Sequence, residues 1–338
     1  MTAAAVTALA VTVAAMPVVL SWLRRSQLLD HPNPRSSHSV ATPRGGGIAV
    51  VLGMAGGLLT AQVDGYQGTS WLLVPVATYA VLGLADDRRS LPASLRLAVQ
   101  ALAAAAAVLM LLQRLGAPAG VEPWWGQAAG CAAAVVWVVG CTNAFNFMDG
   151  VNGISSLNAI LAGLFFAWLG ASHDVAGLEL TGVIIAASAL GFLPWNAPRA
   201  RVFLGDVGSY ALGSALALSG VWAAWAGIDP VLVAAPLCIY LADTGWALLK
   251  RLRGHRPWRE AHREHVYQRL VDSGMSHLAS AATTVMASAL LVAVVVVLDK
   301  TSTVGPAIVA AAIVVVYLSL PRFVAGTTAR RQSAGAAA

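Results

Sequence analysis

The chain has 338 residues, of which 58% are hydrophobic and only 11% charged, and its mean hydropathy is +0.72. This composition is typical of a polytopic membrane protein and does not fit a water-soluble domain. The formal net charge of +6 is confined to short loops. It therefore indicates membrane topology and affinity for anionic headgroups, and we expect no nucleic-acid partner.

Apolar segments of the roughly 17 to 25 residues needed to cross a bilayer recur along the chain. The first is followed, not preceded, by basic residues, which favours a retained span over a cleaved signal peptide. We expect an all-α, polytopic integral membrane protein with about eleven transmembrane helices, at 3–23, 45–62, 70–85, 94–112, 128–147, 153–171, 178–194, 207–226, 230–249, 278–298 and 303–320.

The basic residues alternate between the loops, and 19 of the 21 fall on one side of the expected membrane. The positive-inside rule then places the N-terminus outside and the C-terminus in the cytoplasm. We expect one transmembrane domain, 1–325, and a disordered tail, 326–338. Its cytoplasmic loops are expected at about 24–44, 86–93, 148–152, 195–206 and 250–277.

Four aspartates, Asp86, Asp87, Asp149 and Asp206, lie at the ends of apolar segments on this predicted cytoplasmic side. A carboxylate beside a membrane span is costly and therefore indicates a functional site. The adjacent pair could balance the arginines that follow it, or it could bind Mg²⁺ together with substrate phosphates. Asp206 could cap a helix, but its two flanking glycines favour a metal or phosphate that approaches the backbone.

Asn143 and Asn146 share a helix face with Asp149, because they are spaced three residues apart. Gly150 and Gly153 then permit a break before the next span. Amides at the end of an apolar helix need polar partners. Contact with a nucleotide or metal is favoured over helix–helix hydrogen bonding.

The first and last cytoplasmic loops carry donors suited to phosphate. Arg35 and His38 lie in a loop broken by prolines, which is otherwise an ordinary basic loop. Arg263 and His265 lie in the last loop, whose basic surroundings favour phosphate over metal. Asp243, inside the ninth span, could pair with a basic residue near the helix end or line a cleft.

In this order, the motifs resemble those of the bacterial polyprenyl-phosphate N-acetylhexosamine-1-phosphate transferases, a family that includes the phospho-MurNAc-pentapeptide translocase. The matching residues are Asp30-x-Pro32-Asn33-x-Arg35-x-x-His38, Asp86-Asp87-Arg88, Asn143-x-x-Asn146-x-x-Asp149-Gly150 and Phe203-x-Gly205-Asp206-x-Gly208-Ser209.

The resemblance implies transfer of an N-acetylhexosamine-1-phosphate from a UDP-sugar to undecaprenyl phosphate, with release of UMP. Mg²⁺ is the implied cofactor, and Mn²⁺ is an alternative. The expected location is the bacterial inner (cytoplasmic) membrane, with the active site on the cytoplasmic face. The product would prime O-antigen or cell-wall glycan synthesis, and a homodimer is compatible with this reaction.

The resemblance also implies roles for single residues. Asp206 would be the first metal ligand, and Asp149 would lie near the nucleotide and also contribute to the metal site. Asp86 or Asp87 would orient or deprotonate the lipid phosphate. A covalent phospho-aspartate remains an alternative to direct attack. The remaining substrate-binding candidates are Phe203, which would stack on uracil, Asn143 and Asn146 near the nucleotide, and Arg35, His38, Arg263 and His265 for phosphates.

The chain departs from the family pattern at two places. Asn152 stands where the family often has a second aspartate, which argues against an anionic ligand there. The last loop reads His265-Val266-Tyr267-Gln268 in place of a His-x-His-His cluster, and in this it resembles members that transfer other N-acetylated sugars. A secondary transporter also uses intramembrane carboxylates, but no internal repeat supports that alternative.

Overall fold

The computed structural model describes residues 1–32, 40–65, 68–116, 124–255, 263–298 and 304–336. Each predicted span coincides with helical structure. The long helices are α1 (Thr2–Arg25), α2 (Gly47–Val63), α3 (Leu73–Arg89), α4 (Ala93–Leu115), α5 (Trp124–Met148), α6 (Ile154–Ser172), α7 (Ala176–Asn196), α8 (Gly205–Trp225), α10 (Cys238–Arg253), α12 (His277–Leu298) and α13 (Val304–Ala336).

Within the described residues, nine helical segments are long and apolar enough to cross a membrane. The predicted polytopic, helical membrane fold is therefore confirmed. The two other predicted spans form α2 and α3, which have 17 residues each and stand at the lower limit for a bilayer. The total of eleven crossings stays a prediction.

Helix α8 is the centre of the bundle. Its residues from Gly205 to Ala223 are all buried, and it contacts α2, α3, α5, α6 and α7. A helix that is apolar on all sides and enclosed by others belongs to a bundle core. The first turn of this central helix carries Asp206.

The connections hold some further structure. Pro236 interrupts the predicted span 230–249, which divides into α9 (Pro230–Ala234), the 3₁₀ helix η2 (Ala235–Leu237) and α10. A second 3₁₀ helix, η1 (Ser70–Leu72), precedes α3, and a short helix, α11 (Val266–Asp272), lies in the last loop. In the first loop β1 (Leu29–Asp30) pairs antiparallel with β2 (Thr42–Pro43). This small ribbon was not predicted.

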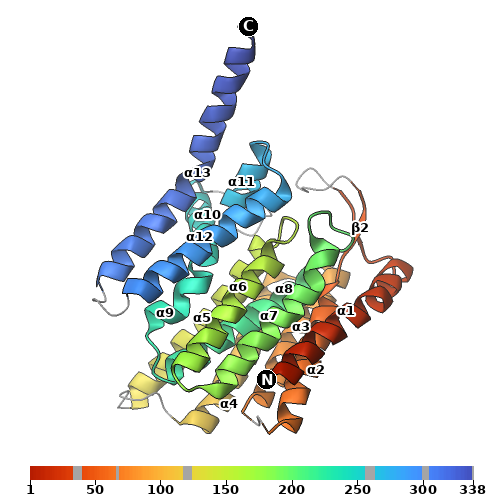
Figure 1. The fold of residues 1–338 in the computed structure, drawn as a ribbon, viewed down its shortest axis with the longest axis vertical. Coiled ribbons are helices and arrows are strands. Elements are labelled where there is room, and N and C mark those ends of the chain that lie inside the picture. The colour runs from red at the N-terminus through yellow and green to blue at the C-terminus, as the bar shows by residue number, and fades with distance from the viewer. Residues whose placement is uncertain (33–39, 66–67, 117–123, 256–262, 299–303, 337–338) are drawn as a thin grey trace.

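The two termini lie at opposite ends of the bundle (Figure 1). The N-terminus lies at the lower end, whereas β2, α11 and the end of α13 lie toward the upper end. This arrangement agrees with an odd number of crossings, but which end faces the cytoplasm stays a prediction. Helix α13 extends to Ala336, into the tail expected to be disordered, and the alanines and arginines there favour helix. The division into domain and tail stays a prediction.

Candidate active site

The start of α8 is held by backbone hydrogen bonds from the loop before α2. The N–H groups of Gly45 and Gly46 donate to the carbonyl oxygen of Phe203 at 3.2 and 2.9 Å, and the Phe203 N–H donates to the carbonyl of Pro43 at 2.8 Å. Gly205, with a φ of +76°, adopts a conformation that other residues rarely take. Together these contacts fix the direction in which Asp206 leaves the backbone.

Helix α3 meets α8 at backbone contact. A Cβ atom added to Gly83 would lie 2.2 Å from the carbonyl oxygen of Asp206, and one added to Gly205 would lie 2.7 Å from Oδ2 of Asp87. Glycine at both positions therefore permits the two helices to touch. The contact brings Asp86 and Asp87, in the last turn of α3, against the first turn of α8.

Asp87 caps α8 from a different helix. Its Oδ1 accepts the backbone N–H of Asp206 at 3.0 Å, and its Oδ2 accepts that of Val207 at 3.1 Å. These N–H groups have no partner within the helix, and a negative charge is favourable at a helix N-terminus. The capping role considered for Asp206 thus belongs to Asp87.

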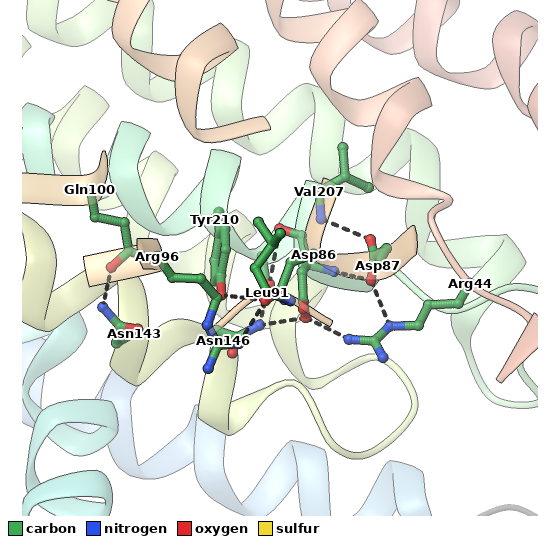
Figure 2. A network of polar contacts seen from close by, with 12 residues as sticks. Arg44, Asp86, Asp87, Leu91, Arg96, Gln100, Asn143, Asn146, Val207 and Tyr210 are labelled. Atoms are coloured by element: carbon green, nitrogen blue, oxygen red, sulfur yellow. Dashed lines mark hydrogen bonds and ion pairs between the residues drawn. The ribbon is translucent and has the colours of Figure 1, made fainter. Parts of the chain in front are cut away.

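Arg44 joins the two carboxylates (Figure 2). Its Nε lies 2.7 Å from Oδ1 of Asp87, and its Nη2 lies 2.6 Å from Oδ1 of Asp206. Burial by itself would lower the pKa of Arg44, but the charges of Asp206 and Asp87 raise it well above its ordinary value. The guanidinium therefore remains charged and offsets the repulsion between these carboxylates.

Asp86, the neighbour of Asp87 on α3, has three partners of its own. It accepts the Leu91 N–H at 2.8 Å, the Arg96 Nη1 at 2.6 Å and the Tyr210 hydroxyl at 3.1 Å. The carboxylate is buried, so these contacts compensate for the lost water. Asp86 thus connects α3 to α4 and α8.

The two asparagines of α5 have different partners. Asn146 donates to Oδ1 of Asp206 at 2.9 Å and to the Ser209 hydroxyl at 2.8 Å. Asn143 donates to the side-chain oxygen of Gln100 at 2.6 Å. These are helix–helix hydrogen bonds, the alternative considered for this motif. Contact of either amide with a nucleotide stays a prediction.

Asp149 comes directly after the last residue of α5 and is half-buried. Burial raises the pKa of Asp149 to about 6, while the charge of Arg44 lowers it and that of Asp206 raises it. Asp149 therefore shares one electrostatic environment with the other aspartates. All four predicted aspartates gather around the start of α8.

The last loop reaches this region through a separate set of contacts. Asp243 accepts the backbone N–H of Val266 at 3.1 and 3.0 Å, is 3.2 Å from Nδ1 of His265, and accepts the Tyr317 hydroxyl at 3.0 Å. Asp243 thus anchors α11 and contacts His265. The two alternatives considered from the sequence, a basic partner near the helix end and a place in a cleft, stay open. The Tyr267 hydroxyl donates to the carbonyl of Phe147 at 3.0 Å, two residues before Asp149.

Two of the four predicted phosphate-binding residues, Arg263 and His265, lie within the described part of the chain. Arg263 forms an ion pair with Asp272 at 2.5 Å, and His265 is buried beside Asp243. Arg35 and His38 lie outside the described residues. Phosphate binding by these four side chains, and uracil stacking by Phe203, stay predictions.

Sequence comparison identifies the family. Residues 69–224 match the family described as Glycosyl transferase family 4. The probable undecaprenyl-phosphate N-acetylglucosaminyl 1-phosphate transferase of Bacillus subtilis is 27% identical over 271 residues, which cover 78% of this chain and 75% of that protein. The decaprenyl-phosphate N-acetylglucosaminephosphotransferase of Mycobacterium leprae is 30% identical over 307 residues, which cover 80% and 77%. The chain belongs to glycosyl transferase family 4.

A further relative is named for a different sugar-phosphate substrate. The phospho-N-acetylmuramoyl-pentapeptide-transferase of a Synechococcus species is 33% identical over 267 residues, which cover 71% of this chain and 74% of that protein. The resemblance to polyprenyl-phosphate sugar-1-phosphate transferases is therefore confirmed. The family 4 match begins at Thr69 and ends at Ala224, so it contains all four aspartates.

Three side chains that contact these aspartates were not predicted: Arg44, Arg96 and Tyr210. In the sequence both arginines contribute to the charge pattern that predicts the topology. Arg44 immediately precedes Gly45-Gly46-Gly47, and Arg96 lies within the first turn of an apolar helix. A charge in either position was a signal that it has a buried partner.

The charge of the cluster is compatible with the divalent cation that the sequence resemblance implies. Arg44 and Arg96 form ion pairs with three of the carboxylates, those of Asp86, Asp87 and Asp206. Asp149 adds a fourth negative charge within reach of the Arg44 charge, so the ionised cluster has an excess of negative charge. Within the described residues, no three His, Cys, Asp or Glu side chains form a complete metal site. Mg²⁺ does not need three such protein ligands, because it commonly binds one or two carboxylates together with water and substrate phosphates. Asp206 and Asp149 would hold it.

Proposed function

We propose that this family 4 protein is a Mg²⁺-dependent transferase of the cytoplasmic membrane. It transfers an N-acetylhexosamine-1-phosphate from a UDP-sugar to undecaprenyl phosphate and releases UMP. The reaction takes place on the cytoplasmic face and primes a cell-surface polysaccharide. The observation that carries this proposal is the cluster of four aspartates around the start of α8, in a chain whose relatives are named as such transferases.

The residue types fit the chemistry. Both substrates carry phosphates that repel each other, and a bound divalent cation would offset this charge while the lipid phosphate attacks the β-phosphorus. Asp206 and Asp149 would present carboxylate oxygens toward the two substrates. Asp86 accepts three hydrogen bonds, and Asp87 accepts two and forms an ion pair with Arg44, so orientation of neighbouring groups suits them better than proton abstraction.

The donor sugar is proposed from the relatives. The last loop departs from the His-x-His-His pattern, but the relatives in Bacillus and Mycobacterium are named for N-acetylglucosamine. UDP-N-acetylglucosamine is therefore the first donor to test, with UDP-N-acetylgalactosamine and 6-deoxy analogues beside it.

The test is UMP release by the purified protein in detergent. It is supplied with undecaprenyl phosphate, Mg²⁺ and each UDP-sugar, with and without EDTA. We expect release that depends on both substrates and stops with EDTA. If folded protein releases no metal-dependent UMP with any donor, the transferase proposal is wrong.

Asp206→Asn is the matched variant, since the amide keeps the shape of the side chain. We expect normal expression and a loss of UMP release of about 100-fold or more, because the lost charge acts directly at the reacting phosphates. Full activity of this variant would contradict the assignment of Asp206. A transporter would instead bind or move substrate without forming UMP.

A further inference from the structure

The backbone of Arg44 is fixed on both sides. Its N–H donates to the carbonyl of Leu28 at 3.0 Å, and Arg44 itself forms an isolated parallel bridge with Phe203, just after β2. The side chain therefore starts from a defined point between the β1–β2 ribbon and the start of α8. Side chains held by such a scaffold position their partners more accurately than those on free loops.

The guanidinium uses separate nitrogens for two carboxylates. Nε contacts Asp87 and Nη2 contacts Asp206, both at Oδ1 (Figure 2). Asn146 donates to the same Oδ1 of Asp206, so this carboxylate is held from two directions. Lysine could not reproduce the bridge, because it carries a single ammonium group on a flexible stem.

We propose that Arg44 is a positioning residue that fixes Asp206 and, in doing so, limits the affinity of Asp206 for the divalent cation. This inference rests on the proposed function, because it takes Asp206 as a cation ligand. The arginine and the cation carry like charges and share one carboxylate. Each therefore weakens the binding of the other, and the substrate phosphates would relieve this repulsion when they arrive.

Two substitutions separate charge from geometry. Arg44→Gln removes the positive charge, and Arg44→Lys keeps the charge but loses the two-carboxylate bridge. If the inference holds, Gln strengthens cation binding, whereas Lys leaves cation binding nearly unchanged and lowers turnover. Arg88→Gln is the control, since Arg88 is exposed at the same end of α3 and stacks on Trp22 at 5.0 Å.

The readout is direct cation binding. Mn²⁺ accepts the same oxygen ligands, and its free-ion electron paramagnetic resonance signal falls as it binds. The full-length protein in detergent is titrated with Mn²⁺ without substrates, and Mg²⁺ is then added as competitor. We expect about tenfold tighter binding by Arg44→Gln than by the wild type, because a like charge near the ion is removed. Arg44→Lys and Arg88→Gln should stay within about twofold.

UMP release is measured in parallel. Arg44→Lys is expected to retain no more than about one hundredth of wild-type turnover, because a misplaced ligand weakens the whole catalytic arrangement. Unchanged or weaker Mn²⁺ binding by a folded Arg44→Gln variant would overturn the inference. If Arg44→Gln does not fold, equal turnover of Arg44→Lys and wild type would overturn it.

These outcomes are distinguishable from failure of the proposed function. If the wild type releases UMP only with metal but Arg44→Gln binds Mn²⁺ as the wild type does, the role of Arg44 is wrong and the proposed reaction stands. If the wild type binds no Mn²⁺ and releases no UMP, the proposed function itself fails.

Discussion

The carboxylate of Asp87, at the end of α3, accepts the backbone N–H of Asp206, in the first turn of α8, at 3.0 Å. The two residues are separated by 119 positions in the chain, yet one defines the local structure of the other. The side chain of Asp87 is 1% exposed, so water cannot replace it as a cap. The position of Asp206 therefore depends on an aspartate from another helix.

Asp87→Asn should lower both stability and turnover. The amide nitrogen cannot accept a hydrogen bond, so one backbone N–H of α8 loses its acceptor, and the Arg44 guanidinium loses the negative charge beside it. We expect the free energy of unfolding to fall by about 1–3 kcal/mol. Thermal unfolding in detergent measures this loss, and UMP release measures the effect on turnover. Wild-type melting of this variant would contradict the capping role.

Gly83→Ala should disrupt the contact between α3 and α8. Its Cβ would lie 2.2 Å from the Asp206 carbonyl oxygen, so the helices must separate, which typically costs about 1–3 kcal/mol. Turnover should fall together with the melting temperature. Gly140→Ala is the control, because a Cβ at Gly140 meets no atom within 4 Å. Equal behaviour of the two variants would be inconsistent with backbone contact at Gly83.

The activity should decline as the pH falls below about 6. Burial raises the pKa of Asp149 to about 6, so protonation below that value removes a proposed cation ligand. Since the cation competes with the proton, saturating Mg²⁺ should move the acid limb of the pH profile to lower pH. UMP release at two Mg²⁺ concentrations tests this, with melting curves at each pH to exclude unfolding. An acid limb that stays at the same pH at both Mg²⁺ concentrations would contradict the assignment of Asp149 as a cation ligand.

Tyr317→Phe should loosen the last loop. The hydroxyl donates to Asp243, which also holds the start of α11 beside His265. Loss of this buried hydrogen bond should cost about 1 kcal/mol and raise the KM for the UDP-sugar more than it lowers kcat. Ser319→Ala on the same helix is the control, because Ser319 bonds only its own helix at Val315 among the described contacts. An unchanged KM for the UDP-sugar in Tyr317→Phe would show that this contact of α13 does not affect substrate binding.

The amino-acid sequence by itself was enough to identify a polytopic membrane protein, to locate its apolar segments and to single out the four aspartates as candidate site residues. Hydrophobic segments and loop charges are local properties, so they can be found without tertiary contacts. The ordered motifs around Asp86, Asp149 and Asp206 also identified the family. These features depend on neighbours within a few residues.

The tertiary structure decided which partner each charge has. Arg44 contacts Asp206 across 162 positions, and Asp243 holds a backbone N–H at Val266 across 23. Such pairs follow from how the helices pack, which for α3 and α8 is set by the absence of a side chain at Gly83. For that reason Arg44 was counted only as a topological charge until the packing around α8 placed it between two carboxylates.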